Sequence, residues 1–249
     1  MTKTSECRLC LQRKELRESH VLPEFLFTQA YDNKHRFYGL SSIEGRGIRL
    51  FQKGLRERLL CGDCEGRLSV FEQHARGVLY GGAPISVQDL RDYIVVGNID
   101  YRKLKLFLMS LLWRLDVSSL PRFKGTPLDP CHRERLRKML VEENPGATWE
   151  YGCMITRLVH EGKPLAGLIT PVFSCKVLGH WAYAIAAGGF VFTFVVSDHE
   201  ATVAEPAFLQ LDGTLRVPCK EFTQIPFLMR HAMAIMKTNM GKELPGGKA

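Results

Sequence analysis

Two short segments decide the fold of this chain: Cys7-Arg8-Leu9-Cys10 and Cys61-Gly62-Asp63-Cys64, with residues 11–60 between them. Each segment is a C-x2-C pair, and two such pairs can present four thiolates in the tetrahedron that zinc prefers. Disulfide frameworks belong instead to shorter, secreted chains. The pattern therefore predicts a structural zinc ion held by Cys7, Cys10, Cys61 and Cys64. The alternative is four reduced cysteines that have this spacing by chance.

The fifty residues between the pairs exceed the roughly 15 to 20 that separate the pairs of a compact zinc ribbon. Further structure must therefore be folded inside the loop. The residues that follow the second pair, Glu65 to Glu72, are expected to form the start of a helix.

The composition describes a globular chain with a core of its own. Of its 249 residues, 45% are hydrophobic and 24% charged, which excludes disordered, collagen-like and coiled-coil classes. The net charge of +8 favours a polyanionic partner such as nucleic acid. Residues 1–80 hold 14 of the 34 Lys and Arg residues, so basic side chains are denser in this part.

A stretch rich in glycine, residues 77–84, is the most plausible boundary because Gly and Pro interrupt regular elements. We therefore expect an α+β protein with a small zinc-bound module over 1–80, a larger α+β domain over 81–240 and a flexible tail over 241–249. The larger domain could bind a protein partner or form a homo-oligomer, and no motif selects between these.

Local signals predict the elements of the larger domain. Asp100 is placed to cap an apolar, buried helix over 101–116, and a charged helix follows over 132–143. Strands are expected over 153–159, 165–177 and on both sides of Gly188-Gly189, which reads as a hairpin turn.

A last helix is expected over 226–240, with Pro226 in its first turn. Methionines 229, 233, 236 and 240 follow one face of this helix. We expect this face to pack in the core, with a partner or dimer surface as the alternative.

No membrane span is expected, because the longest apolar stretch, 181–196, is shorter than about 18 residues and is interrupted by Gly188-Gly189. The N-terminus has no apolar signal-peptide region. With the paired cysteines, this favours a reducing, cytoplasmic location. The remaining cysteines, Cys131, Cys153, Cys175 and Cys219, lack paired spacing and are expected to be small core residues.

The loop between the cysteine pairs contains Ser19-His20-Val21-Leu22-Pro23, and the second pair continues into Glu65. Cys-x2-Cys, then a His-Val-Leu-Pro segment, then Cys-x2-Cys opening a helix resembles the zinc-stabilised HNH (ββα-metal, treble-clef) nucleases over about residues 7–75. Together with Leu112-Trp113-Arg114, it also resembles uncharacterised bacterial proteins described as HNH-nuclease-like.

The resemblance implies roles for single residues. His20 would be the general base that takes a proton from the attacking water, and imidazole suits this role because its pKa of about 6.5 leaves it largely neutral near pH 7. His20 and Glu65 would lie at a catalytic Mg2+ or Mn2+, with Glu65 replacing the asparagine of the family as a ligand. Ser19 falls where the family has a metal-binding aspartate. This departure puts the cation in doubt, and Glu18, Glu24 and Glu72 are candidate replacements.

Each of these residues also has a structural interpretation. His20 could merely bind its own loop or assist the zinc shell. His74 could be the last histidine of the family or a solvent-facing side chain, and Asp32 and His35 are expected to form only a surface turn. A basic stretch, Arg46, Arg49, Lys53, Arg56 and Arg58, could follow a phosphate backbone or be a solvated loop.

Two functions follow. The first is a metal-dependent HNH endonuclease that hydrolyses DNA, in a bacterial defence or mobile-element setting that the resemblance implies. The second is a zinc-stapled module that binds nucleic acid or protein and cuts nothing. A third site around Asp198, His199 and Glu200 is more simply a turn.

Overall fold

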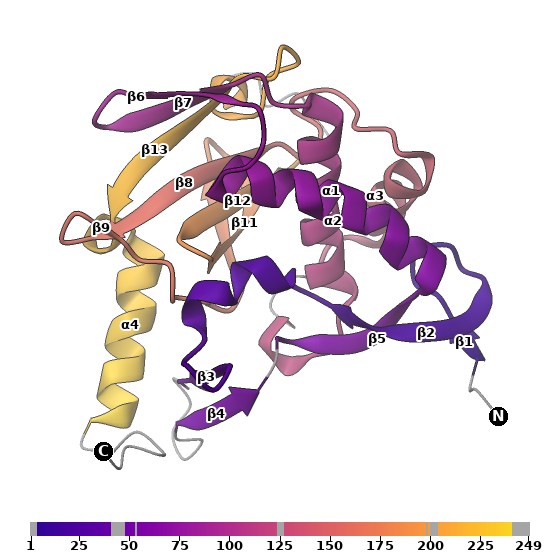
Figure 1. Ribbon diagram of the computed structural model, residues 1–249, viewed down its shortest axis with the longest axis horizontal. Helices are drawn as coiled ribbons and strands as arrows, with labels where there is room; N and C mark the ends of the chain where they lie inside the picture. Colours follow the sequence, from indigo (N-terminus) through magenta and orange to yellow (C-terminus); the bar gives the residue numbers. More distant parts are fainter. Residues whose placement is uncertain are drawn as a thin grey trace.

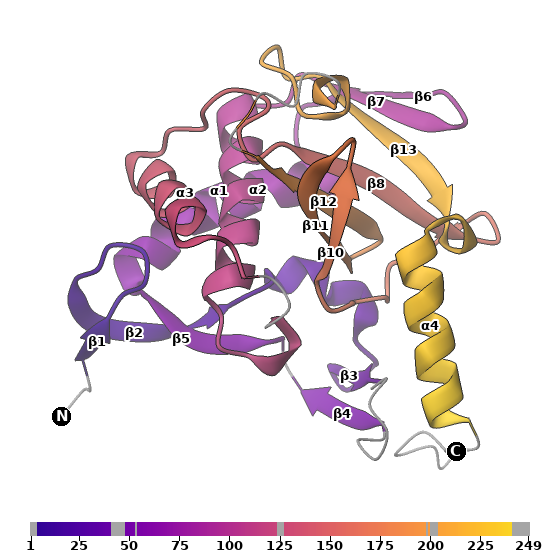
Figure 2. The same cartoon turned by 180° about the vertical axis from the view of Figure 1, so that it is seen from behind.

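The computed structural model of the chain describes residues 4–40, 48–52, 54–123, 127–197, 199 and 204–240. It is a mixed α+β structure in which a group of helices lies beside a small sheet and a larger one (Figures 1 and 2). No helix in the described ranges is long and apolar enough to cross a membrane.

The N-terminal part builds a three-stranded sheet and one long helix. The sheet has the order β1-β2-β5, with both pairs antiparallel. Helix α1 follows β5 directly and packs against β2 and β5. The loop between β2 and β5 holds two 3-10 turns and a separate hairpin, β3-β4. The bounds are β1 Thr4–Glu6, β2 Arg13–His20, η1 Glu24–Leu26, η2 Thr28–Ala30, β3 Arg36–Gly39, β4 Arg49–Gln52, β5 Arg56–Cys61 and α1 Gly62–Tyr80.

The larger sheet has the order β10-β11-β12-β8-β13-β7-β6, and β9 pairs with β8 outside this path. All of its pairs are antiparallel except that between β8 and β13, which is parallel. The strands are β6 Ser86–Asp89, β7 Tyr93–Gly97, β8 Cys153–His160, β9 Lys163–Pro164, β10 Phe173–Val177, β11 His180–Ala187, β12 Phe190–Val196 and β13 Leu215–Glu221.

Helix α2, Tyr101–Val117, is the centre of the helical group and packs against both α1 and α3, Pro130–Glu142. Its cap is as predicted: the Asp100 carboxylate accepts a hydrogen bond from the Lys103 N–H at 3.0 Å. Every residue from 104 to 115 is buried, so the apolar pattern correctly predicted a helix surrounded by protein.

The Gly188-Gly189 hairpin is confirmed. Ala187 and Phe190 face each other across the turn, and both glycines have positive φ, 60° and 88°. A two-residue turn of this kind needs φ above zero at both positions, which glycine adopts without strain. The strand expected over 165–177 is shorter, because only 173–177 joins the sheet. Pro171 lacks an N–H for the ladder, which is consistent with the late start.

Helix α4, Pro226–Asn239, has the predicted position but not the predicted burial (Figure 1). Met233, Met236 and Met240 are 52, 61 and 86% exposed, and Leu228 is the buried residue of the helix. The prediction that the methionine face packs in the core is therefore wrong. Periodicity places these side chains on one face, but here no other element covers that face in the described chain.

Gly81 caps the C-terminal end of helix α1 with a φ of 92°. It lies in the glycine-rich stretch, residues 77–84, that was predicted to be a boundary. The largest cluster of buried apolar side chains nevertheless runs from Cys7 in the N-terminal part to Val217 in β13, and two smaller clusters lie in the larger part of the chain. The zinc-site segments and the larger sheet therefore share a core. The predicted tail, residues 241–249, lies outside the described residues.

Candidate functional site

The four paired cysteines converge at the start of the small sheet. Cys7 and Cys10 lie in the turn between β1 and β2, where the Leu11 N–H donates to the Cys7 carbonyl at 2.8 Å. Cys61 ends β5 and Cys64 lies in the first turn of α1. Antiparallel pairing of β2 with β5, with Leu16 opposite Cys61, brings the two clamps together.

The geometry of this cluster fits a tetrahedral zinc ion. The four Sγ atoms all lie within 4.8 Å of one another. A tetrahedron with zinc–sulfur bonds of about 2.3 Å has edges of about 3.8 Å, and the Sγ atoms of Cys10 and Cys61 are 3.9 Å apart. Cys7, Cys61 and Cys64 are buried. Four thiolates leave no open coordination position, so zinc here would serve folding and not catalysis.

Hydrogen bonds within the cluster favour the thiolate form of one of its four cysteines, Cys7. The Cys61 N–H donates to Cys7 Sγ at 3.3 Å. A hydrogen bond from the Cys64 thiol, assisted by backbone N–H groups, lowers the pKa of Cys7 to about 4 despite burial. Zinc binds the thiolate form of cysteine. The donor set and its burial therefore agree with a metal site. The pKa of Cys10, raised by burial, and that of Cys64, raised by its hydrogen bond to Cys7, mean that metal binding would have to release protons from these two thiols.

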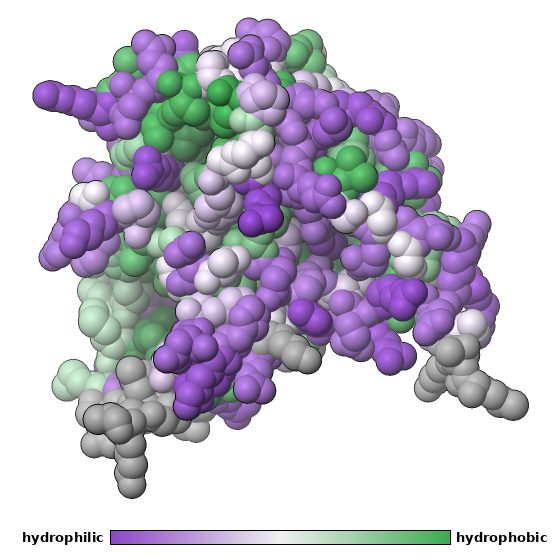
Figure 3. All heavy atoms as spheres, viewed as in Figure 1, coloured by the Kyte–Doolittle hydropathy of each residue, from purple (hydrophilic) through white to green (hydrophobic). Residues whose placement is uncertain are grey.

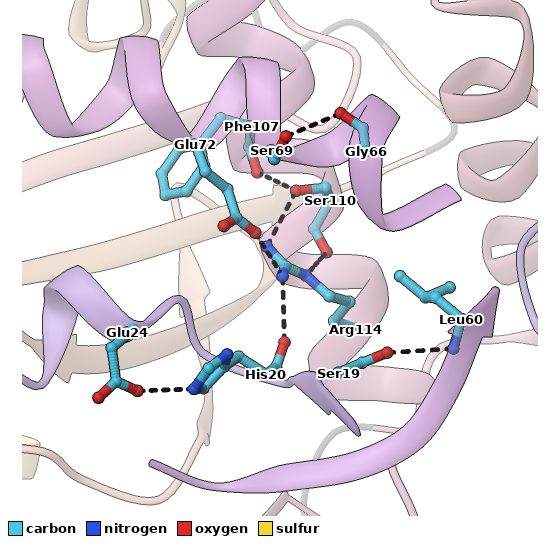
Figure 4. A network of polar contacts seen from close by, with 10 residues as sticks. All are labelled: Ser19, His20, Glu24, Leu60, Gly66, Ser69, Glu72, Phe107, Ser110 and Arg114. Carbon is cyan, nitrogen blue, oxygen red and sulfur yellow. Dashed lines mark hydrogen bonds and ion pairs between the residues drawn. The ribbon is translucent and has the colours of Figure 1, made fainter. Parts of the chain in front are cut away.

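The other end of β2 carries His20. Beyond an irregularity between Leu16 and Glu18, the ladder continues until His20 faces Arg56 at the start of β5. Ser19 is fully buried, and its Oγ accepts a hydrogen bond from the Leu60 N–H at 3.1 Å (Figure 4). Ser19 thus ties β2 to β5, which is a structural task that its place in the motif did not reveal.

The His20 imidazole faces the carboxylate of Glu24, which lies one turn further along the chain in η1 (Figure 4). His20 Nε2 and Glu24 Oε2 are 2.6 Å apart, and the His20 side chain is 24% exposed. Neither of these two atoms forms a hydrogen bond of good geometry within the described residues, so the contact is a close electrostatic pair. With the ring proton on Nε2, toward the carboxylate, Nδ1 would be the acceptor of a neutral imidazole.

Burial and the nearby Arg56 guanidinium lower the pKa of His20, against the opposing effect of Glu24. The imidazole is therefore neutral at pH 7. Neither ring nitrogen makes a hydrogen bond within the parts of the chain that the structure describes, and Nε2 is the buried one of the two. His20 thus has the protonation state and the free nitrogen of a base.

Glu24 is shared by more side chains than the sequence indicated. The Tyr31 hydroxyl donates to Oε1 at 2.8 Å, and His35 Nε2 lies 3.2 Å from the same oxygen. The His35 ring stacks on Tyr31 with a centroid distance of 3.8 Å. Arg56 lies 3.8 Å from Oε2. Burial raises the pKa of Glu24, but the hydrogen bond from Tyr31 and the neighbouring groups lower it overall.

The expectation that Asp32 and His35 form only a surface turn is thus half right. Asp32 binds Arg36 within the turn, at 2.8 Å, whereas His35 turns back toward Glu24. Its φ of 57° is in the left-handed region, which reverses the chain at this point. No spacing rule relates His35 to Glu24, so the sequence carried no signal for this contact.

A buried arginine fixes the backbone at His20. The Arg114 side chain of α2 is 2% exposed, donates to the His20 carbonyl at 3.1 Å and pairs with Glu72 of α1 at 2.7 Å (Figure 4). Ser110 holds the same guanidinium from within α2. The three elements β2, α1 and α2 therefore meet at one cation.

Other predicted residues lie apart from this contact network. Glu65 has no contact with His20 among those described, and its Oε1 is buried without a hydrogen-bond partner there. His74 is half-buried, not solvent-facing, and burial lowers its pKa. Glu18 pairs with Arg58 on the surface.

The basic stretch is described in part. Arg49 is exposed on β4, whereas Arg46 and Lys53 lie outside the described residues. So do Asp198 and Glu200 of the third predicted site, and His199 between them is exposed.

The remaining cysteines do not form a second cluster in the described chain. Cys153 is buried as predicted, Cys175 and Cys219 are half-buried, and Cys131 is exposed. Cys131 is therefore not a core residue.

Comparison with known proteins adds no relative: no family model, curated protein or solved structure matches this chain. What the structure supports by itself is a mixed α+β protein with an N-terminal four-cysteine cluster fit for a metal ion such as zinc.

Proposed function

We propose that this chain is a zinc-stabilised phosphodiester hydrolase of the HNH type that acts on nucleic acid, with DNA as the first substrate and His20 as the general base. One observation carries the proposal. The order strand, strand, helix of β2, β5 and α1 has the four-cysteine cluster at one end and a neutral His20 with a free Nδ1 at the other.

His20 would act as a general base that removes a proton from water. In the proposed step the water oxygen forms a bond to phosphorus as its proton passes to Nδ1, the bond from phosphorus to the sugar oxygen breaks, and the leaving sugar oxygen takes a proton from solvent water. Glu24 lies 2.6 Å from Nε2 and favours the tautomer with its proton on that nitrogen, as a carboxylate does for catalytic histidines elsewhere. General base catalysis of this kind contributes about 10²- to 10⁴-fold in rate.

In this proposal Arg56 neutralises the negative charge of the phosphate. Arg56 faces His20 across the ladder, and its Nε is buried without a hydrogen-bond partner in the described residues. A guanidinium matches the geometry of phosphate oxygens. Arg49 and Arg58 extend the positive charge along β4 and β5.

The donor set for a catalytic Mg2+ or Mn2+ does not fit the family pattern. The Ser19 hydroxyl is buried and already accepts from Leu60, and Glu65 does not contact His20. Among the described residues, the cysteine cluster is the one convergent group of three or more metal-ligating side chains. We therefore assign no step to a cation.

A second function has a specific observation in its favour. Because Ser19 is engaged in holding β5, the same framework would also serve a module that binds nucleic acid and cuts nothing. Arg49, Arg56 and Arg58 would then make the phosphate contacts.

Plasmid cleavage separates the two functions. The zinc-loaded chain is incubated with supercoiled plasmid, with and without Mg2+ or Mn2+. We expect nicking by the wild type and a loss of at least about 100-fold in His20→Ala, with His160→Ala, an exposed histidine of β8, as the matched control. Because the pKa of His20 is lowered, cleavage should persist to a pH below the ordinary imidazole value of about 6.5 and decline only where this ring becomes protonated.

Zinc content and circular dichroism establish that each variant is folded. Cleavage that survives in His20→Ala would remove His20 as the base. Folded protein that cuts neither DNA nor RNA, but binds them with a steep salt dependence, would establish the binding module.

A further inference from the structure

A second hollow lies away from the cysteine cluster and from His20. It is a cavity of about 700 Å³ whose walls come from the end of α1, the strands β6, β7, β8 and β13, and the turn between β11 and β12. Apolar side chains gather over this part of the surface below β6 and β7 (Figure 3). Its size is in the range of roughly 300 to 1,000 Å³ that small-molecule sites occupy.

The lining is apolar apart from one charge. Val78, Ile94, Val217 and Phe190 are typical of it, and Arg157 of β8 is its one charged residue. Arg157 lies beside Phe190 of β12 and Cys219 of β13 in the ladder. No carboxylate of the described chain lies within ion-pair distance of Arg157.

Leaving apolar lining exposed to water, and the Arg157 guanidinium without a counter-charge, is unfavourable in free energy unless a ligand occupies the cavity. Val87 at the rim is 61% exposed and Tyr80 is 40% exposed, although both line the cavity. Each Å² of apolar surface removed from water is worth roughly 25 cal/mol. A guanidinium in such surroundings binds an anion more strongly than it does in open water.

Contacts between the walls hold them in place relative to one another. The Tyr80 hydroxyl at the end of α1 donates to the Gly188 carbonyl at 2.6 Å, which joins the helix to the hairpin turn. Tyr80 also packs edge-on against Phe190 with a centroid distance of 5.9 Å. The remaining walls are strands of one sheet. A ligand would therefore meet a preformed site, with little ordering cost.

We propose that this cavity binds a small molecule with an apolar body and a single anionic group, in which the body lies against Ile94, Val217 and Phe190 and the anion meets Arg157. The site does not depend on the proposed hydrolase function, because it shares no residue with the His20 contacts. A neutral apolar molecule of the same size would occupy the hollow with lower affinity.

Two fluorescent probes of matched shape test this. 1-Anilinonaphthalene-8-sulfonate carries an apolar aromatic body and one sulfonate, and N-phenyl-1-naphthylamine has the same rings without the charge. We expect the wild type to bind both, and Arg157→Met to weaken the sulfonate probe by about tenfold while the neutral probe changes by less than about twofold. Arg157→Lys should lie between the wild type and Arg157→Met.

Two further variants localise the site. Ala166→Trp places an indole in the cavity and should abolish binding of both probes. Arg230→Met, at an exposed arginine of α4, is the control for loss of positive charge and should change neither probe. Thermal melting verifies that each variant is folded.

The proposal is refuted if the wild type binds neither probe, or if folded Ala166→Trp binds both as the wild type does. It is also refuted if Arg157→Met weakens the two probes equally, because the anion would then have no partner in Arg157.

Discussion

The two ends of the β2–β5 ladder show how differently one pair of strands can be used. At one end, four sulfur atoms lie within 4.8 Å of one another in a mostly buried cluster. At the other, the His20 and Glu24 side chains are 24 and 36% exposed and have arginines on both sides. The first end is chemically closed, and the second is open to a reactant.

The difference lies in what holds each end. The cysteine cluster is built by local turns and by the ligands themselves, so zinc can supply much of its stability. The His20 end has no such centre and is held by Arg114, which reaches it from another helix. We therefore expect a metal-dependent end and a packing-dependent end on the same strands.

The largest effect should come from the closed end. Cys61→Ser removes one zinc ligand, and because metal binding and folding are linked, we expect loss of zinc and a stability loss of about 5 kcal/mol or more. Zinc analysis of the purified protein and thermal denaturation measure the two. Cys131→Ser, at an exposed cysteine outside the cluster, is the control. Unchanged zinc content and melting in Cys61→Ser would contradict the structural zinc site.

The next effect should come from the cation that anchors the open end. Arg114→Met leaves Glu72 and the His20 carbonyl without their buried donor, and we expect a loss of about 2 to 4 kcal/mol in urea denaturation with zinc retained. Arg58→Met is the matched control, because its pair with Glu18 is about 60% exposed on both sides and should contribute less than about 1 kcal/mol. Equal losses in the two variants would show that Arg114 does not anchor this end.

The smallest effect should come from the hydrogen bond between Ser19 and Leu60, which joins β2 to β5. Ser19→Ala leaves the Leu60 N–H buried without its acceptor, and we expect a loss of about 1 to 2 kcal/mol in urea denaturation. Plasmid cleavage per folded molecule should stay unchanged, because Ser19 does not contact the reacting groups. Ser69→Ala, at a half-buried serine of α1 whose hydroxyl donates to the Gly66 carbonyl, is the control. A selective loss of cleavage in stable Ser19→Ala would assign Ser19 a catalytic role.

Much of the secondary structure of the larger part was predictable because its signals are local. The Asp100 cap, the apolar helix that follows it and the Gly188-Gly189 turn each depend on residues a few positions apart. The strand predicted from 165 begins late, and the methionine face of α4 is exposed. In both cases the prediction was wrong because strand pairing and the burial of a helix face depend on which distant segment, if any, packs against them.

The candidate site divides in the same way. The cysteines and His20 were visible in the motif, whereas the contacts of His20 with Glu24, Arg56 and Arg114 were not. Glu24 is one of three carboxylates, with Glu18 and Glu72, that could replace the missing aspartate, and spacing alone does not choose among them. The choice depends on the turn of η1, which directs Glu24 back to His20.

Residue types at short spacing were enough to predict the four-cysteine cluster, the Asp100 helix cap and the hairpin turn. Only the tertiary structure decided that Ser19 is a structural tie, that Arg114 supports His20 from α2, and that Arg157 lies in an apolar hollow. Burial and charge pairing depend on contacts between segments that are far apart in the chain. The periodicity of one segment does not specify which other segment will pack on it.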